Sequence, residues 1–218
     1  MALVPHRFLF RVAHPCLYRK AMPRLKGDRL LDLPDECRID SFAAMDDVRD
    51  YAEFSLAWNE LGLGLRIQVR GKEAGPVGDV SRPRSSDGVT LWIDTRDART
   101  NHRASRYCHQ FHFLASGGGE ERDEPVALQT KIHRALEDAP LASPSDLPLR
   151  VQTRAGGYAL EAFLPAVALQ GFDPEQHPRI GFFYSIHDAE LGYQLPSVTN
   201  DFPYWEDPTL WQVLELAR

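Results

Sequence analysis

The chain has 218 residues, of which 43% are hydrophobic and 26% are charged, and its formal net charge is −6. This composition is typical of a soluble globular protein that is long enough to bury a sizeable core. The negative charge and the absence of any long Lys/Arg run argue against a nucleic-acid partner, and the longest apolar runs fall far short of the roughly 20 residues that cross a bilayer.

The N-terminal segment and the cysteines bear on location. The apolar stretch in MALVPHRFLFRVAHP is short, is interrupted by Arg11 and is not followed by a small-residue cleavage site, so we expect no secretory signal peptide. Cys16, Cys37 and Cys108 form neither a CxxC pair nor a disulfide framework. We therefore expect reduced thiols and a cytoplasmic location.

Residues 1–47 lack the regular alternation of the rest of the chain. Their Pro and Gly punctuation, as in HPCLYRKAMPRLKGDRLLDLP, predicts an irregular arm with one or two short strands. From residue 51 onward, YAEFSLAW and GLGLRIQVRGK alternate with a period of two, which is typical of half-buried strands joined as a hairpin. The side chains predicted to point inward from the second strand are Leu63, Leu65, Ile67 and Val69.

The middle of the chain alternates short strands with turn-rich loops. EAGPVGDVSRPRSSDG predicts a surface loop, GVTLWIDTR and YCHQFHFLA predict strands, and SGGGEERDEP predicts a flexible loop. VALQTKIHRAL fits either a strand or a short helix, and we favour a strand. LRVQTRAGGYALEAFLP predicts a hairpin that turns at Gly156 and Gly157.

The last third of the chain completes the pattern. AVALQGF predicts one helical turn ended by Gly171, and both RIGFFYSIHDAELGYQL and LWQVLEL predict strands. Many short strands with little helix predict an all-β fold, namely an antiparallel β-sandwich with a jelly-roll-like course and short helical turns. We expect residues 1–47 to form an N-terminal arm packed on a single sandwich domain of residues 48–218.

Four of these segments, in this order, resemble family 9 carbohydrate-binding modules, within the wider DOMON-like group of sandwiches. DGVTLWIDTR is similar to the family's DSVEIFID strand, and GYALEAFLPAVAL is similar to its strand ending in E-x-x-IP. RIGFFYSIHDAE resembles the strand ending in VNDAD, and EDPTLWQVLEL resembles the terminal segment. The resemblance covers roughly residues 48–218 and implies a non-catalytic, carbohydrate-binding β-sandwich.

The resemblance departs at the family's sugar site. That site sandwiches a sugar between two aromatic rings, one of them from the loop before the DSVE strand. Here the loop is PVGDVSRPRSSDG, which has no aromatic residue, and Thr90 replaces the acidic residue of DSVE. These departures predict a different mode of binding. Haem-binding members of the wider group use Met and His ligands, but the methionines here all precede the strong strands, which argues against haem.

Polar side chains share the outward faces of three predicted strands. Their donors suit a sugar, a carboxylate or a phosphate, although an ordinary solvated sheet face has the same pattern. If exposed, Trp92 and the aromatic rings of the DFPYWEDP loop would add stacking on a ligand. The alternatives are that the arm or the second sheet covers Trp92, and that the DFPYWEDP loop closes the end of the sandwich. The candidate ligand-binding residues are Arg66, Gln68, Trp92, Gln110, His112, Arg150, Gln152, Tyr204 and Trp205.

Signatures for metals and catalysis are weaker. The segment IDTRDARTN offers oxygen ligands at Asp94, Asp97 and Asn101, and the resemblance implies structural calcium there. The alternative is that these side chains cap a turn and pair with nearby arginines. His109 and His112 point to opposite faces of a strand, and neither HExxH nor GxSxG is present. We expect no catalytic residue and no cofactor other than this calcium.

Three functions stay open at this point. The first is a non-catalytic ligand-binding module, with carbohydrate as the ligand class by resemblance. The second is an interaction or scaffold domain that presents Trp92 and DFPYWEDP as an apolar patch to a protein partner or to a second copy of the chain. The third is an enzyme of unknown class that uses the His and Arg face. We favour the non-catalytic functions over the third.

Overall fold

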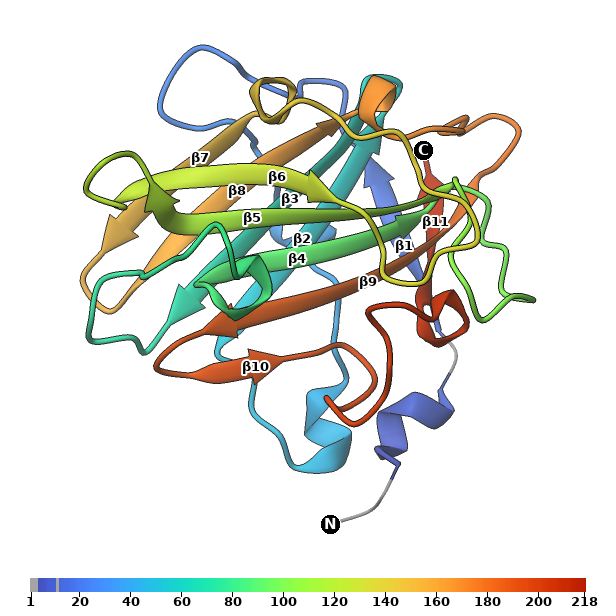
Figure 1. Ribbon diagram of the computed structural model, residues 1–218, viewed down its shortest axis with the longest axis horizontal. Helices are drawn as coiled ribbons and strands as arrows, with labels where there is room; N and C mark the ends of the chain where they lie inside the picture. Colours follow the sequence, from blue (N-terminus) through green and yellow to red (C-terminus); the bar gives the residue numbers. More distant parts are fainter. Residues whose placement is uncertain (1–3, 11) are drawn as a thin grey trace.

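The computed structural model describes residues 4–10 and 12–218, and these residues are built mainly of β-strands (Figure 1). Residues 1–3 and 11, which belong to the predicted arm, lie outside the described residues. The strands are β1 Ala13–Tyr18, β2 Ala52–Asn59, β3 Gly62–Arg70, β4 Gly88–Asp94, β5 Cys108–Gly118, β6 Glu124–Thr130, β7 Leu149–Arg154, β8 Gly157–Pro165, β9 Arg179–Asp188, β10 Gly192–Gln194 and β11 Gln212–Ala217. The all-β prediction is confirmed.

Short 3₁₀ turns account for the helical part of the described chain. None of the helices found in these residues is long and apolar enough to cross a membrane. The predicted turn in AVALQGF is present as η6. The turns are η1 His6–Leu9, η2 Asp35–Cys37, η3 Ala43–Asp46, η4 Pro83–Ser85, η5 Pro144–Asp146, η6 Ala166–Ala168 and η7 Pro208–Leu210.

The strands form one continuous sheet in the order β6-β5-β4-β9-β11-β1-β2-β3-β8-β7, with β10 beside β9. The sheet curls over, so that β6, β5, β4 and β9 cross in front of β7, β8, β3 and β2 in Figure 1. This corrects the prediction of two purely antiparallel sheets, because β1 runs parallel to both β11 and β2. Parallel pairing requires long connections, and β1 has them because it comes from the arm.

The hydrophobic core fills the inside of the curl. Period-two alternation aims one apolar set inward from each strand, and every predicted inward side chain of β3 is at most 2% exposed. Opposite halves of the sheet meet where the rings of Phe54 on β2 and Tyr184 on β9 stack with centroids 4.0 Å apart. Each such buried side chain contributes about 1.5–3 kcal/mol relative to exposure, so the curl is held by its two apolar inner faces.

The arm covers part of the outside of the curl. Leu30 and Leu31 pack with Met22 against Phe163 of β8. A side chain at Gly64 of β3 could not fit beneath this cover, since its Cβ would lie 2.9 Å from the sulfur of Met22. The outer surface of β3 and β8 is therefore largely occupied by the chain's own N-terminal region.

One carboxylate fastens the arm to the sheet. The Glu161 side chain on β8 accepts the backbone N–H groups of Leu30 at 2.8 Å and of Leu31 at 3.0 Å. Its loss would leave two amides without their acceptor. We expect Glu161→Ala to lower the free energy of unfolding by about 2 kcal/mol in urea titrations, and Glu161→Gln to lower it less. Glu120→Ala, in an exposed loop, is the control, and an equal loss in that variant would refute the role of Glu161.

Candidate functional site

The predicted ligand-binding residues divide between the two outer faces of the curled sheet. One group lies on the face of β3, β8 and β7, where Glu161 stands between its neighbours in the strand register. This group consists of Arg66, Gln68, Arg150 and Gln152. The other group lies on the face formed by β4, β5, β6 and β9, or in the segment that covers it. This second group consists of Trp92, Gln110, His112, Tyr204 and Trp205.

The arm engages the first face directly. The Gln152 side chain donates to the carbonyl of Asp28 at 3.0 Å, and Arg150 donates to the carbonyl of Leu25 at 3.4 Å. Both side chains therefore hold the arm in place. The sequence could show that these residues share a face, but it could not show which distant segment would pack on that face.

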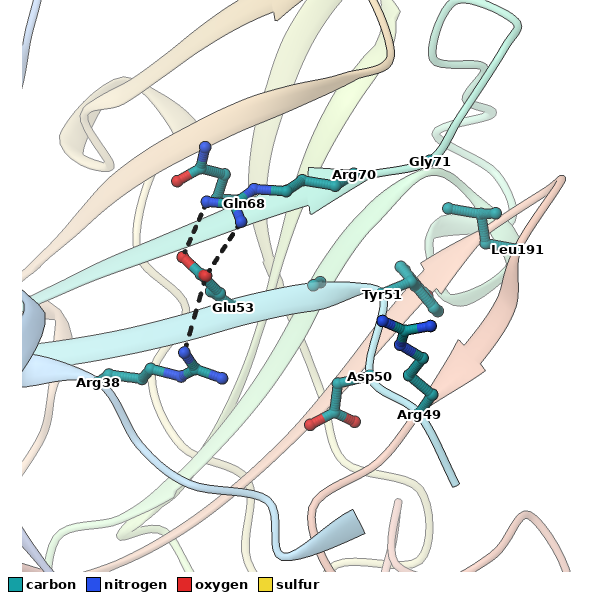
Figure 2. Close-up of a pocket in the computed structure, with 10 residues that line it drawn as sticks. Arg38, Arg49, Asp50, Tyr51, Glu53, Gln68, Arg70, Gly71 and Leu191 are labelled. Atoms are coloured by element: carbon teal, nitrogen blue, oxygen red, sulfur yellow. Dashed lines mark hydrogen bonds and ion pairs between the residues drawn. The ribbon is translucent and has the colours of Figure 1, made fainter. Parts of the chain in front are cut away.

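A hollow of about 550 Å³ opens beside the arm, and Gln68 contributes to its lining (Figure 2). Figure 2 shows Glu53 between two arginines of this lining. The Glu53 carboxylate lies 3.7 Å from Arg38 and 3.4 Å from Arg70. The guanidinium charge of this hollow is thus partly neutralised from within the chain.

On the second face, Trp92 is fully buried rather than exposed. The C-terminal segment covers it: Tyr204, itself 1% exposed, meets the Trp92 ring edge-on with centroids 5.5 Å apart. Covering was the predicted alternative, but the cover comes mainly from residues 195–211, with Phe8 of the arm packed against the same cluster, and not from a second sheet. Trp92 and Tyr204 therefore pack in the interior of this region, and neither ring is accessible for stacking on a ligand.

A polar network extends from Trp92 along β5. The Trp92 indole N–H donates to the side-chain carbonyl oxygen of Gln110 at 2.8 Å, which fixes the orientation of the Gln110 amide. The amide nitrogen of Gln110 therefore points to His112 Nε2 at 3.0 Å and to the Thr130 hydroxyl at 2.9 Å. His112 Nε2 must then be an acceptor, and its Nδ1 carries the proton toward Thr90 at 2.9 Å. The indole thus fixes both an amide orientation and a tautomer.

His112 stays neutral at physiological pH. Burial lowers its pKa to about 3, and the nearby charge of Arg84 acts in the same direction. The imidazole is 1% exposed and has hydrogen-bond partners at both nitrogens, which leaves it poorly placed for proton transfer to a ligand. The His112 imidazole therefore acts as a rigid structural group on this face of the sheet.

A second hollow, of about 350 Å³, opens above this network, and we call it the β5 hollow. Its floor is Gln110, His112 and Thr130, and its walls are residues 82–85 and Tyr193 of β10. Tyr193 is 45% exposed, so its ring is available to a ligand. The sequence predicted Gln110 and His112 here, but Tyr193 and residues 82–85 were not predicted because they join the site only through the fold.

Among the described residues, Arg84 on the wall of the β5 hollow packs on an aromatic ring and not against a carboxylate. Its guanidinium carbon lies 5.0 Å from the centroid of the half-buried Trp205 ring, a cation–π arrangement. Its neighbour Arg82 pairs with Asp79 at 3.2 Å. Within the described part of the chain, Arg84 makes no ion pair with a carboxylate. The predicted Trp205 thus contributes to the site as the partner of an arginine.

The residues predicted to bind calcium have partners within the chain. Asp94 accepts two backbone N–H groups at 2.9 and 2.7 Å, Asp97 pairs with Arg99 at 2.7 Å, and Asn101 accepts a backbone N–H at 3.1 Å. These contacts correspond to the turn-capping alternative. No group of three or more His, Cys, Asp or Glu side chains is arranged to hold a metal among the residues that the structure describes.

A buried ion cluster anchors the two loops that form the β5 hollow. The Lys72 ammonium lies 3.0 Å from both Asp87 and Asp188, and 3.7 Å from Glu190. Burial alone would lower the pKa of Lys72, but its hydrogen bonds to Asp188 and Asp87 outweigh burial and raise it. Asp87 ends the loop that carries residues 82–85, and Asp188 begins the turn before β10, so this cluster positions both walls.

Comparisons with known proteins identify the fold. No protein-family model matches the sequence, and a comparison with curated proteins found no match. Among solved structures, the chain is similar to a family 9 carbohydrate-binding module from Caldicellulosiruptor kristjanssonii in complex with cellotriose, at 15% identity and a TM-score of 0.52, with 77% of this chain and 74% of that chain covered. The glucose complex gives 14% identity and a TM-score of 0.52, with 77% and 76% covered. A proposed carbohydrate-binding protein from Bacteroides uniformis ATCC 8492 gives 15% identity and a TM-score of 0.51, with 78% and 82% covered. The chain has the family 9 module-like fold that its sequence predicted.

Proposed function

We propose that this chain is a non-catalytic carbohydrate-binding module and that the β5 hollow holds the sugar. The observation that carries the proposal is the combination of an exposed Tyr193 ring with a polar floor in one hollow. A sugar presents C–H faces that pack on aromatic rings and hydroxyl groups that pair with polar side chains, so it matches both features. The similar modules of known structure hold cellotriose or glucose, which supports the same ligand class here.

The protein-partner alternative loses its main support. It relied on Trp92 and the DFPYWEDP loop as an exposed apolar patch, yet Trp92 is fully buried and Tyr204 is 1% exposed. Both rings pack with Phe183 inside the chain. The β5 hollow, whose lining includes arginine, glutamine and threonine side chains, suits a small hydrophilic ligand.

Calorimetric titration against a panel of neutral and acidic oligosaccharides tests the proposal. We expect at least one saccharide to bind, and Tyr193→Ala to weaken its binding about 10-fold, since an aromatic contact of this kind is worth roughly 1 kcal/mol or more. Phe10→Ala removes a ring that is 53% exposed outside the hollow and should leave the affinity unchanged. Absence of any binding up to about 10 mM saccharide would refute the proposed function.

A further inference from the structure

We infer that the β5 hollow selects a sugar that carries a carboxylate, a uronic acid, over the corresponding neutral sugar, with Arg84 as the residue that binds the carboxylate. This inference rests on the proposed function, because it concerns the class of saccharide held at the same site. It depends on the charge distribution around Arg84 and on the way its guanidinium is held.

The first observation is that Arg84 is half-buried and has no carboxylate partner in the described residues. The chain has 31 acidic and 25 basic residues, so a shortage of carboxylates does not explain this. Two arginines that line a hollow near a carboxylate are paired with it: Arg82 contacts Asp79, and Arg70 contacts Glu53. A partly desolvated guanidinium without a counter-charge favours an anionic ligand, and its planar donors match a carboxylate.

The second observation is the position of Trp205 under Arg84. The guanidinium carbon lies 5.0 Å from the ring centroid, so the indole limits the movement of the side chain. Packing of this kind uses the face of the guanidinium, and the in-plane N–H groups beyond the one directed to the Tyr204 hydroxyl can donate to a ligand. An arginine that is already held loses less conformational entropy when it binds a ligand, which favours tight and geometrically specific recognition.

The third observation is the lining of the β5 hollow. In the part of the chain that the structure describes, the lining contains two arginines but neither aspartate nor glutamate. No acidic lining group would therefore repel a ligand carboxylate. The floor adds the half-buried Thr130 hydroxyl, which accepts from Gln110 and keeps a second acceptor site for a sugar hydroxyl. The hollow of Figure 2 differs because its lining includes two carboxylates, Asp50 and Glu53, and Glu53 lies between two of its arginines.

The test uses uronic-acid oligosaccharides and their methyl esters, which keep the ring configuration but remove the negative charge. We expect calorimetric titration of the full chain to show about 10-fold tighter binding of the free acid than of the ester, and an advantage that shrinks as salt is added. Arg84→Gln should remove the advantage by lowering the affinity for the acid to about that for the ester. Arg96→Gln is the matched control, since Arg96 is also half-buried and packs on an aromatic ring, that of Tyr107, but does not line the β5 hollow, and it should retain the advantage.

The outcomes separate this inference from the proposed function. Equal affinity for the acid and its ester would overturn the charge selection while the carbohydrate-binding proposal stood. Retention of the acid's advantage in Arg84→Gln would overturn the role of Arg84. Acetate competing as effectively as the uronic acid would show a plain anion site and overturn the saccharide selection. Binding of neither acid nor ester would overturn this inference, and the proposed function would fall with it only if the neutral oligosaccharides of the panel also failed to bind. Thermal unfolding of each variant establishes that it is folded.

Discussion

Replacing Lys72 with methionine should lower the free energy of unfolding by about 3–5 kcal/mol at pH 7, because it leaves a buried pair of carboxylates without their cation. Lys72 is 3% exposed, and Asp87 and Asp188 are fully buried. Methionine preserves the apolar stem but removes the ammonium that lies 3.0 Å from each carboxylate. The effect arises from desolvated like charges and not from lost packing.

Urea unfolding of three variants separates these causes. Arg218→Met breaks an exposed ion pair with Glu60 at 3.0 Å and should cost at most about 1 kcal/mol. The double variant Lys72→Met/Asp188→Asn should recover part of the loss, because asparagine removes one charge and keeps an oxygen for the backbone N–H groups that Asp188 accepts. A loss in Lys72→Met no larger than in Arg218→Met would contradict the role given to this cluster.

The same substitution should also weaken saccharide binding. Asp87 accepts the backbone N–H of Val77 at 3.0 Å and that of Ala189 at 2.7 Å, so it links the loop before β4 to the turn after β9. Arg84 lies in the first of these segments, and Tyr193 follows the second. Without the ammonium between them, the Asp87 and Asp188 carboxylates repel each other, which should shift the two walls of the β5 hollow and weaken saccharide binding in the calorimetric titration.

The strands were predictable because their signal is local. Alternation along residues 62–70 follows from the two-residue period of a strand, and it assigned every core residue of β3 to the correct side. Likewise, the polar set on β5 was placed on one face by alternation alone, and Gln110 and His112 do line one hollow. Local periodicity thus found the floor of the candidate site.

The rest of the site depends on contacts between distant residues, which periodicity does not encode. Lys72 and Asp188 are 116 positions apart, and no spacing motif joins them. Sequence reasoning noted that the loop before β4 lacks an aromatic residue, but it did not foresee that Arg84 from this loop would pack on Trp205. Similarly, the parallel pairing of β1 follows from where the arm returns to the sheet, which a local pattern cannot specify.

Acid should destabilise the protein well before its carboxylates are protonated, and the main reason is the two buried histidines whose pKa is lowered most, with a further contribution from His14, whose pKa burial also lowers. Burial lowers the pKa of His112 to about 3 and that of His109 to about 4, whereas both histidines have the ordinary pKa of 6.5 in the unfolded chain. The unfolded state therefore binds more protons below pH 6.5. The stability that these neutral histidines provide is present above pH 6.5 and is lost as the pH falls toward 3–4.

Between pH 7 and pH 5, each histidine should account for a loss of about 2 kcal/mol in the free energy of unfolding, roughly 4 kcal/mol together, as measured in urea at the two pH values. His112→Gln should reduce this pH-dependent loss by about half, whatever its effect on stability at pH 7. His133→Gln is the control, since that side chain is 74% exposed and should leave the loss unchanged. If His112→Gln shows the full wild-type loss, His112 is not the buried neutral group that fixes the floor of the β5 hollow, because only a group that protonates on unfolding contributes to this difference.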